Sequence, residues 1–184
     1  KKLELEGLFE RSIKKKIPTY SSKVGIITSS EGAVLQDILN ILERRAPHIQ
    51  CCVYPVPVQG KKSAGKIVIG IKDMNEYGKC DVLIICRGGG SMEDLWAFNE
   101  EIVIRAIYAS AIPIISAIGH ETDITLSDYA ADYIAPTPSV AAEIVSINRE
   151  EVLQKLDYME YGCLQIVKKK LENYFEKINF ICKQ

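Results

Sequence analysis

Two short stretches of the sequence hold the residues best suited to chemistry. The first is RGGGS (87–91), which directly follows the apolar run DVLIIC. Consecutive glycines let backbone N–H groups approach an anion, and a helix that starts next adds positive potential. A guanidinium suits the planar arrangement of phosphate or carboxylate oxygens. Because a tight turn alone would need only one glycine, the stretch predicts a phosphate-binding site formed by Arg87, Gly88, Gly89, Gly90 and Ser91.

The second stretch, GHETD (119–123), offers groups for proton transfer. Histidine is the side chain whose ordinary pKa allows general acid or base catalysis near neutral pH, and Asp123 stands three residues after His120. Asp37, within a helix-like segment, is a third candidate. The ordinary alternatives are a structural histidine and a solvated helix face. His48, in the loop RRAPHI, is expected at the surface.

Composition limits the function classes. The chain has 184 residues, 47% hydrophobic and 26% charged, which is enough for one domain with a full core. A net charge of −1 argues against bulk electrostatic binding to nucleic acid but leaves room for a local anion site. Six cysteines without a CxxC pair indicate reduced thiols and a cytoplasmic protein. No apolar run approaches the ~20 residues that span a bilayer, so no membrane partner is expected.

Strand-like and helix-like segments alternate along the first 119 residues. Near-continuous apolar strands are typical of a sheet buried on both faces, and the alternation predicts an α/β fold with a parallel, doubly wound sheet. Ligands of such sheets bind beyond the carboxyl ends of the strands, where TSSEG, RGGGS and GHETD stand. The predicted strands are 24–29, 49–58, 81–86 and 112–119, and the predicted helices are 31–45, 64–78 and 92–109.

The chain changes character after APTPS (135–139). Apolar residues from Leu164 to Ile181 follow a 3-4-3-4-3 spacing that is typical of a coiled-coil seam, although an amphipathic helix packed on its own domain would read similarly. The start KKLELEGLF is neither a signal peptide nor an initiator methionine, which suggests a fragment of a longer protein. The predicted organisation is an N-terminal linker or helix (1–22), an α/β catalytic domain (23–139) and a long C-terminal helical extension (140–184).

Five ordered blocks resemble the large-subunit family of exodeoxyribonuclease VII: GIITSSEGAVLQDIL, YPVPVQG, RGGGSMEDLWAFNEE, IPIISAIGHETDITLSDYAAD and APTPSVAAE. The resemblance implies a nuclease that trims single-stranded DNA from its ends to oligonucleotides. It also implies a small-subunit partner bound to the helical extension and no strict requirement for a divalent metal. The family's catalytic residues correspond to Asp37, Arg87, His120 and Asp123.

These residues suggest a mechanism and leave alternatives open. Arg87 and the glycine amides can stabilise charge on the phosphate, while His120 acts as general acid or base, oriented by Asp123 or Asp37. In one alternative His120 and the two aspartates hold Mg²⁺ instead. Others are a nucleotide-binding regulatory domain without hydrolysis and a self-associating coiled-coil module. If the four residues Asp37, Arg87, His120 and Asp123 are catalytic, their functional groups should lie within ~10–12 Å of a common point. Arg87 and His120 are expected outside the core.

Overall fold

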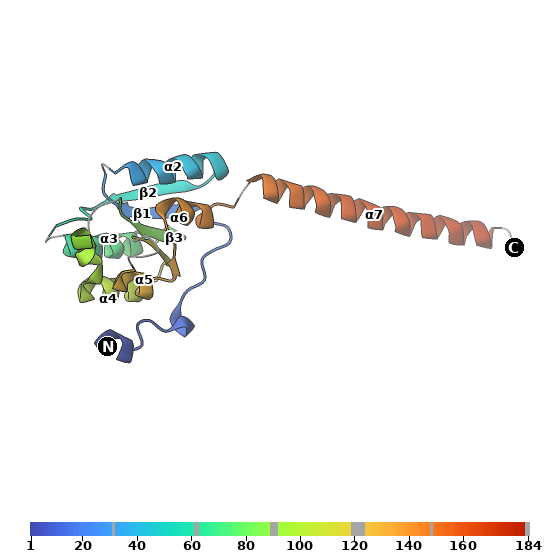
Figure 1. The fold of residues 1–184 in the computed structure, drawn as a ribbon. Coiled ribbons are helices and arrows are strands. Elements are labelled where there is room, and N and C mark those ends of the chain that lie inside the picture. Colours follow the sequence, from blue (N-terminus) through green and yellow to red (C-terminus); the bar gives the residue numbers. More distant parts are fainter. Residues whose placement is uncertain (31, 61–62, 89–91, 119–123, 148, 183–184) are drawn as a thin grey trace. The chain divides into compact units, whose positions relative to one another are not determined.

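The computed structural model describes residues 1–30, 32–60, 63–88, 92–118, 124–147 and 149–182. The chain divides into two compact units, Lys1–Ile147 and Asn148–Gln184. The first unit is an α/β domain, and the second is a single long helix (Figure 1).

A parallel five-stranded sheet forms the centre of the first unit, with the strand order β2-β1-β3-β4-β5 (Figure 1). The fold class and the four predicted strands are confirmed. A fifth strand was not predicted, because its two residues are exposed and too short to show a pattern. The strands are β1 (Lys23–Thr28), β2 (Gln50–Pro55), β3 (Val82–Cys86), β4 (Ile114–Ala117) and β5 (Tyr133–Ile134).

The three central strands β1, β3 and β4 are buried on both faces, which explains their near-continuous apolar runs. Every residue of β3 is buried, and its side chains alternate between two hydrophobic clusters. Leu83 and Ile85 join the first cluster, and Ile84 joins the second. In register, Ile84 lies between Ile26 of β1 and Ile115 of β4, so the core continues across the sheet.

Helices cover both faces. Residues of α2 and α6 belong to the cluster on one face, and those of α3, η2, α4 and α5 belong to the other. The predicted helix 92–109 is two elements, because Glu100 takes an extended conformation that caps the second one. The helices are α2 (Ala33–Arg45), α3 (Ser63–Tyr77), the 3₁₀ helix η2 (Met92–Asn99), α4 (Glu101–Ala109), α5 (Leu126–Ala130) and α6 (Pro138–Val145).

The first 22 residues pack on the α/β domain and contain the short helices α1 (Lys2–Leu5) and η1 (Arg11–Ile13). Leu8 is part of the core. The Asp132 carboxylate accepts hydrogen bonds from the backbone N–H of Lys15, at 2.7 Å, and of Ile114 in β4, at 2.8 Å. One carboxylate therefore attaches the N-terminal segment to the sheet.

The second unit consists of α7 (Arg149–Ile181). Helical structure after residue 139 was predicted, but it comes as two helices, and α6 belongs to the first unit. The six seam residues are 52–68% exposed on α7: Leu164, Val167, Leu171, Tyr174, Ile178 and Ile181. In the described part of the chain, no helix is long and apolar enough to cross a membrane.

All six cysteines are free thiols, and they differ strongly in exposure. Cys163 and Cys182 are exposed on or next to α7, whereas Cys86 ends the fully buried strand β3. Burial raises the pKa of the Cys86 thiol to about 11, although a hydrogen bond with Thr28 acts in the opposite direction. A thiol with an ordinary pKa of 9.0 would have about 100-fold more thiolate at neutral pH.

Thiol labelling of the native chain should therefore follow this order. We expect dithiobis(nitrobenzoic acid) at pH 8 to modify Cys163 and Cys182 at least 100-fold faster than Cys86, because only thiolates attack the reagent. Mass spectrometry of quenched peptides measures each rate. In urea all the rates should converge, and equal rates in the native chain would contradict the buried position of Cys86.

Candidate functional site

The strand order changes direction between β1 and β3, and this is where ligands bind in open parallel sheets. The chain leaves the carboxyl end of β1 towards α2 and the carboxyl end of β3 towards the glycine-rich stretch. A Cβ atom built on Gly88 would lie 3.5 Å from the Val34 Cγ2 atom in the first turn of α2. These two predicted site segments are therefore in contact at one edge of the sheet.

Arg87 is buried, with only 5% of its surface exposed. The expectation that it lies outside the core is wrong, because it directly follows the fully buried strand β3. Its Nε atom donates a hydrogen bond to the carbonyl oxygen of Gly88 at 2.9 Å. A guanidinium in a site of low dielectric attracts an anion more strongly than one in water, and its fixed orientation costs no rearrangement.

Asp37 lies on the exposed side of α2, in the second turn of the helix. It borders a surface depression of about 480 Å³ whose other lining residues are Asn40, Ile41, Arg44 and Ser139. Ser139 comes from the first turn of α6, where the Thr137 hydroxyl accepts a hydrogen bond from the Val140 N–H. The Asp37 carboxylate is thus accessible from solvent in a mostly polar depression between two helices that begin beyond the carboxyl ends of β1 and β5.

The remaining predicted residues lie outside the described residues: Gly89, Gly90, Ser91, His120 and Asp123. Their convergence with Asp37 and Arg87 stays a prediction. A metal site formed by His120, Asp123 and Asp37 also stays a prediction. Within the ranges that the structure describes, no three histidine, cysteine or acidic side chains form a group that could hold a metal ion.

Asp128 was not identified from the sequence, although it is buried and hydrogen-bonded on both sides of the stretch 119–123 in the chain. The residue is 3% exposed, and its carboxylate accepts hydrogen bonds from the Ser116 hydroxyl at 2.5 Å and the Thr125 N–H at 2.6 Å. The Thr125 hydroxyl donates to it as well, at 2.8 Å. Ser116 precedes the stretch 119–123 and Thr125 follows it, so one buried carboxylate connects the two flanks of the segment that carries His120.

A sequence signal for this arrangement exists. The spacing of Thr125 and Asp128 is that of a capping box, in which the two residues satisfy each other's backbone N–H groups at a helix start. The pattern predicts the start of α5, although it does not predict the third partner, Ser116 of β4.

We expect Asp128→Ala to lower the free energy of unfolding by about 3 kcal/mol, because it leaves buried donors on Ser116 and Thr125 without an acceptor. Asp128→Asn should cost less, about 1–2 kcal/mol, because the Ser116 hydroxyl can turn and accept from the amide. Urea denaturation followed by circular dichroism measures both. Asp157→Ala, on the exposed surface of α7, should change the free energy of unfolding by no more than about 0.5 kcal/mol. A change of the same small size in Asp128→Ala would contradict the buried network.

Comparison with known proteins gives a consistent result. The family described as "Exonuclease VII, large subunit" matches residues 8–184. The chain is 50% identical over 181 residues to the exodeoxyribonuclease 7 large subunit of Ruminiclostridium cellulolyticum, covering 97% of this chain and 45% of that relative. It is 57% identical over 159 residues to that of Haemophilus influenzae, covering 86% and 36%. The chain thus spans less than half the length of these relatives.

Proposed function

Because the chain belongs to the exonuclease VII large-subunit family, we propose that it hydrolyses phosphodiester bonds of single-stranded DNA from the strand ends and releases oligonucleotides. The observation that carries the proposal is the buried Arg87 at the carboxyl end of β3, with Gly88 in contact with the first turn of α2. This arrangement supports an anion site at the switch point of a parallel sheet.

In this proposal Arg87 and the backbone N–H groups of Gly88, Gly89 and Gly90 bind the non-bridging oxygens of the scissile phosphate. These oxygens gain negative charge as water attacks the phosphorus atom, so donors that are already oriented stabilise the transition state more than the ground state. The burial of Arg87 strengthens this effect, because little water competes for the guanidinium.

Two proton transfers complete the reaction. The attacking water loses a proton as its oxygen bonds to phosphorus, and the leaving sugar oxygen gains a proton as its bond to phosphorus breaks. We assign His120 to one transfer and an aspartate, Asp37 or Asp123, to the other, with the second aspartate orienting the imidazole. No step in this scheme strictly requires a metal, although the same side chains have the donor atoms that Mg²⁺ prefers.

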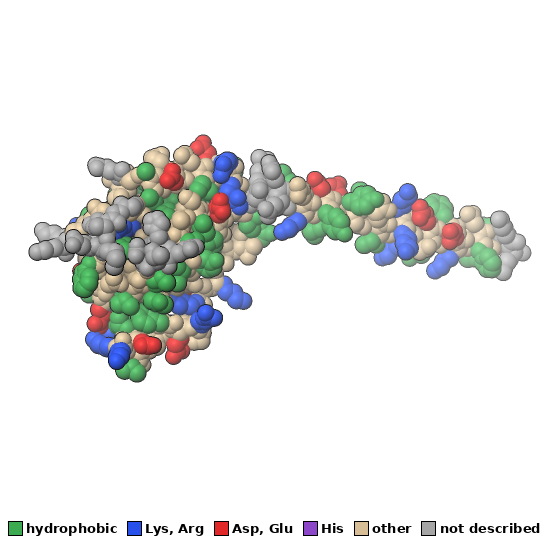
Figure 2. All heavy atoms as spheres, in the orientation of Figure 1, with side chains coloured by type: hydrophobic (Ala, Val, Ile, Leu, Met, Phe, Trp, Pro, Cys, Tyr) green, Lys and Arg blue, Asp and Glu red, His purple; other side chains and the backbone are tan. Residues whose placement is uncertain are grey.

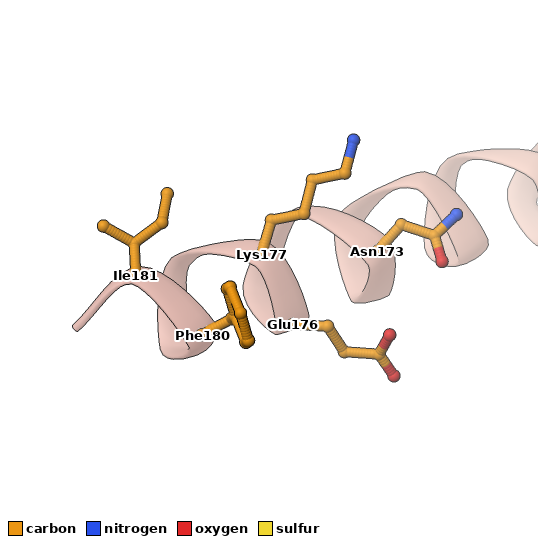
Figure 3. Close-up of a pocket in the computed structure, with 5 residues that line it drawn as sticks. All are labelled: Asn173, Glu176, Lys177, Phe180 and Ile181. Atoms are coloured by element: carbon orange, nitrogen blue, oxygen red, sulfur yellow. The ribbon is translucent and has the colours of Figure 1, made fainter. Parts of the chain in front are cut away.

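The exposed seam of α7 supports a helical partner. Figure 2 shows hydrophobic side chains along this helix, interspersed with charged ones. Near its end, Phe180 and Ile181 are 67% and 68% exposed, beside Glu176 and Lys177 (Figure 3). Exposed apolar surface of this extent is typical of an interaction site. We propose that α7 binds the exonuclease VII small subunit, with self-association as the alternative, and that the complex acts on DNA in the cytoplasm.

We expect Arg87→Lys to lower the rate of single-stranded DNA cleavage by about 100-fold or more, because an ammonium cannot make the planar, paired contact to phosphate oxygens. His120→Asn should lower it similarly, since an amide cannot transfer a proton near pH 7. The assay uses a large-subunit chain that carries this segment together with its N-terminal domain and the small subunit. Acid-soluble product from a labelled oligonucleotide measures the rate, with and without excess chelator.

Two control variants are available in the chain. Arg105→Lys changes an exposed arginine that pairs with Glu6 and Glu101, and His48→Asn changes the other histidine, which is also exposed. Both should cleave at the parent rate. Because Arg87 is buried, thermal unfolding of Arg87→Lys must show a folded domain at the assay temperature. Parent-rate cleavage by folded Arg87→Lys and by His120→Asn would refute the catalytic assignment, and loss of cleavage in chelator would favour the Mg²⁺ alternative.

The role of α7 has its own test. We expect the double substitution Leu171→Glu and Ile178→Glu to abolish co-purification of the small subunit, because it places two charges in the seam without lowering helix propensity. Ile166→Glu, at an exposed apolar position outside the seam, should leave binding within about two-fold of the parent. Binding that survives the double substitution contradicts the proposal. Sedimentation velocity of the chain alone detects self-association through the same helix.

A further inference from the structure

Trp96 is the only tryptophan of the chain, and 72% of its surface is exposed. Its neighbours in η2 are buried: Leu95 and Ala97 are each 8% exposed, and Phe98 is fully buried. The residues before and after Trp96 therefore anchor η2 in the core, while the Trp96 indole faces solvent. An exposed tryptophan on an anchored element loses no burial energy by binding a flat ligand, and little side-chain entropy.

The geometry of η2 links the face that carries Trp96 to the start of α5. A 3₁₀ helix has three residues per turn, so Trp96 and Asn99 lie on the same face, one turn apart. The Asn99 side-chain oxygen accepts a hydrogen bond from the Leu126 N–H at 2.7 Å, and the Ser127 hydroxyl donates to the Phe98 carbonyl at 2.5 Å. The face that carries Trp96 is therefore joined to the start of α5, which follows the stretch that carries His120.

Trp96 is also close in sequence to the glycine-rich stretch. Trp96 follows Ser91, the last residue of the glycine-rich stretch, by five residues, and η2 begins beyond the carboxyl end of β3. The indole thus belongs to an element that follows the proposed phosphate site directly and is hydrogen-bonded to the flank of the other predicted loop. Ile124 and Leu126, on that flank, are 54% and 38% exposed and add apolar surface.

We propose that Trp96 stacks on a nucleobase of single-stranded DNA next to the scissile phosphate; this inference rests on the proposed function. A net charge of −1 gives the chain little non-specific attraction for phosphates, so binding must draw on other contacts. Stacking of bases on aromatic side chains tolerates any sequence, because every base has a π-face. Such a contact suits an enzyme that must hold whatever base stands at the strand end.

The single tryptophan provides a direct readout. In the His120→Asn background, which keeps the oligonucleotide intact, titration of the chain with dT₈ at low salt should quench the Trp96 emission. An abasic oligomer of the same length has the same phosphates but no bases. It should bind about 5- to 100-fold more weakly by fluorescence anisotropy and leave the emission nearly unchanged, which separates stacking from phosphate contact.

Substitutions test the contact without the fluorophore. Trp96→Ala should weaken dT₈ binding about 5- to 100-fold in anisotropy, and Trp96→Phe should restore most of the affinity because the phenyl ring still stacks. Tyr20→Ala is the matched control, since Tyr20 is also 72% exposed but precedes β1 and so lies at the opposite edge of the sheet. In the cleaving large-subunit complex, Trp96→Ala should raise the KM for DNA more than it lowers kcat.

The outcomes separate this inference from the proposed function. The stacking role is overturned if dT₈ binds without changing the Trp96 emission and if Trp96→Ala binds dT₈ as tightly as the parent. Normal cleavage in the same experiments leaves the nuclease assignment standing. The same holds if Trp96→Ala prevents small-subunit binding but not DNA binding, which would make Trp96 a protein contact. Failure of the chain to bind dT₈ at low salt also overturns the inference. Parent-rate cleavage by Arg87→Lys and His120→Asn would refute the catalytic roles of these two residues, whereas the nuclease assignment itself fails if the large-subunit complex releases no acid-soluble product.

Discussion

The burial of β3 on both faces is the constraint on which the rest of the structure depends. All five residues of the strand are fully shielded from solvent, and β1 and β4 pair with it on either side. The strand runs parallel to both neighbours, and the helices of the crossover connections cover the two faces of the sheet. The parallel arrangement then brings the carboxyl ends of β1, β3 and β4 to one edge, although these strands lie far apart in the sequence.

The burial of β3 also determines the burial of Arg87. The residue follows β3 without an intervening turn, so its side chain begins where the core ends. A buried guanidinium is costly unless its N–H groups are satisfied, and the Gly88 carbonyl at 2.9 Å supplies one acceptor. A guanidinium held in place at the end of a buried strand is oriented before any anion arrives, so an anion that binds there causes little rearrangement.

The sequence was sufficient for the features that depend on long apolar patterns. The strands β1, β3 and β4 were predicted because burial on both faces makes each of them a continuous apolar run, whereas the partly exposed edge strand β2 was predicted from its β-branched and aromatic residues. The strand β5 was not predicted, because two residues carry no pattern, and the break at Glu100 was not, because periods of 3.0 and 3.6 residues are hard to distinguish over one short segment. Arg87 was misjudged and Asp128 was missed for a shared reason: charged residues are mostly exposed, and only the tertiary structure shows which ones are buried with partners.

The two kinds of surface at this edge of the sheet complement each other. The buried Arg87 and the glycine amides that follow it are suited to a phosphate group, which is the same in every nucleotide. The exposed indole of Trp96 is suited to a base, whichever base it is. Neither surface requires a strongly basic protein, so a net charge of −1 is compatible with the proposed binding of a nucleotide at a strand end. In the proposed function, such a site binds through a few short-range contacts, and long-range attraction for the rest of the strand requires basic surface outside it.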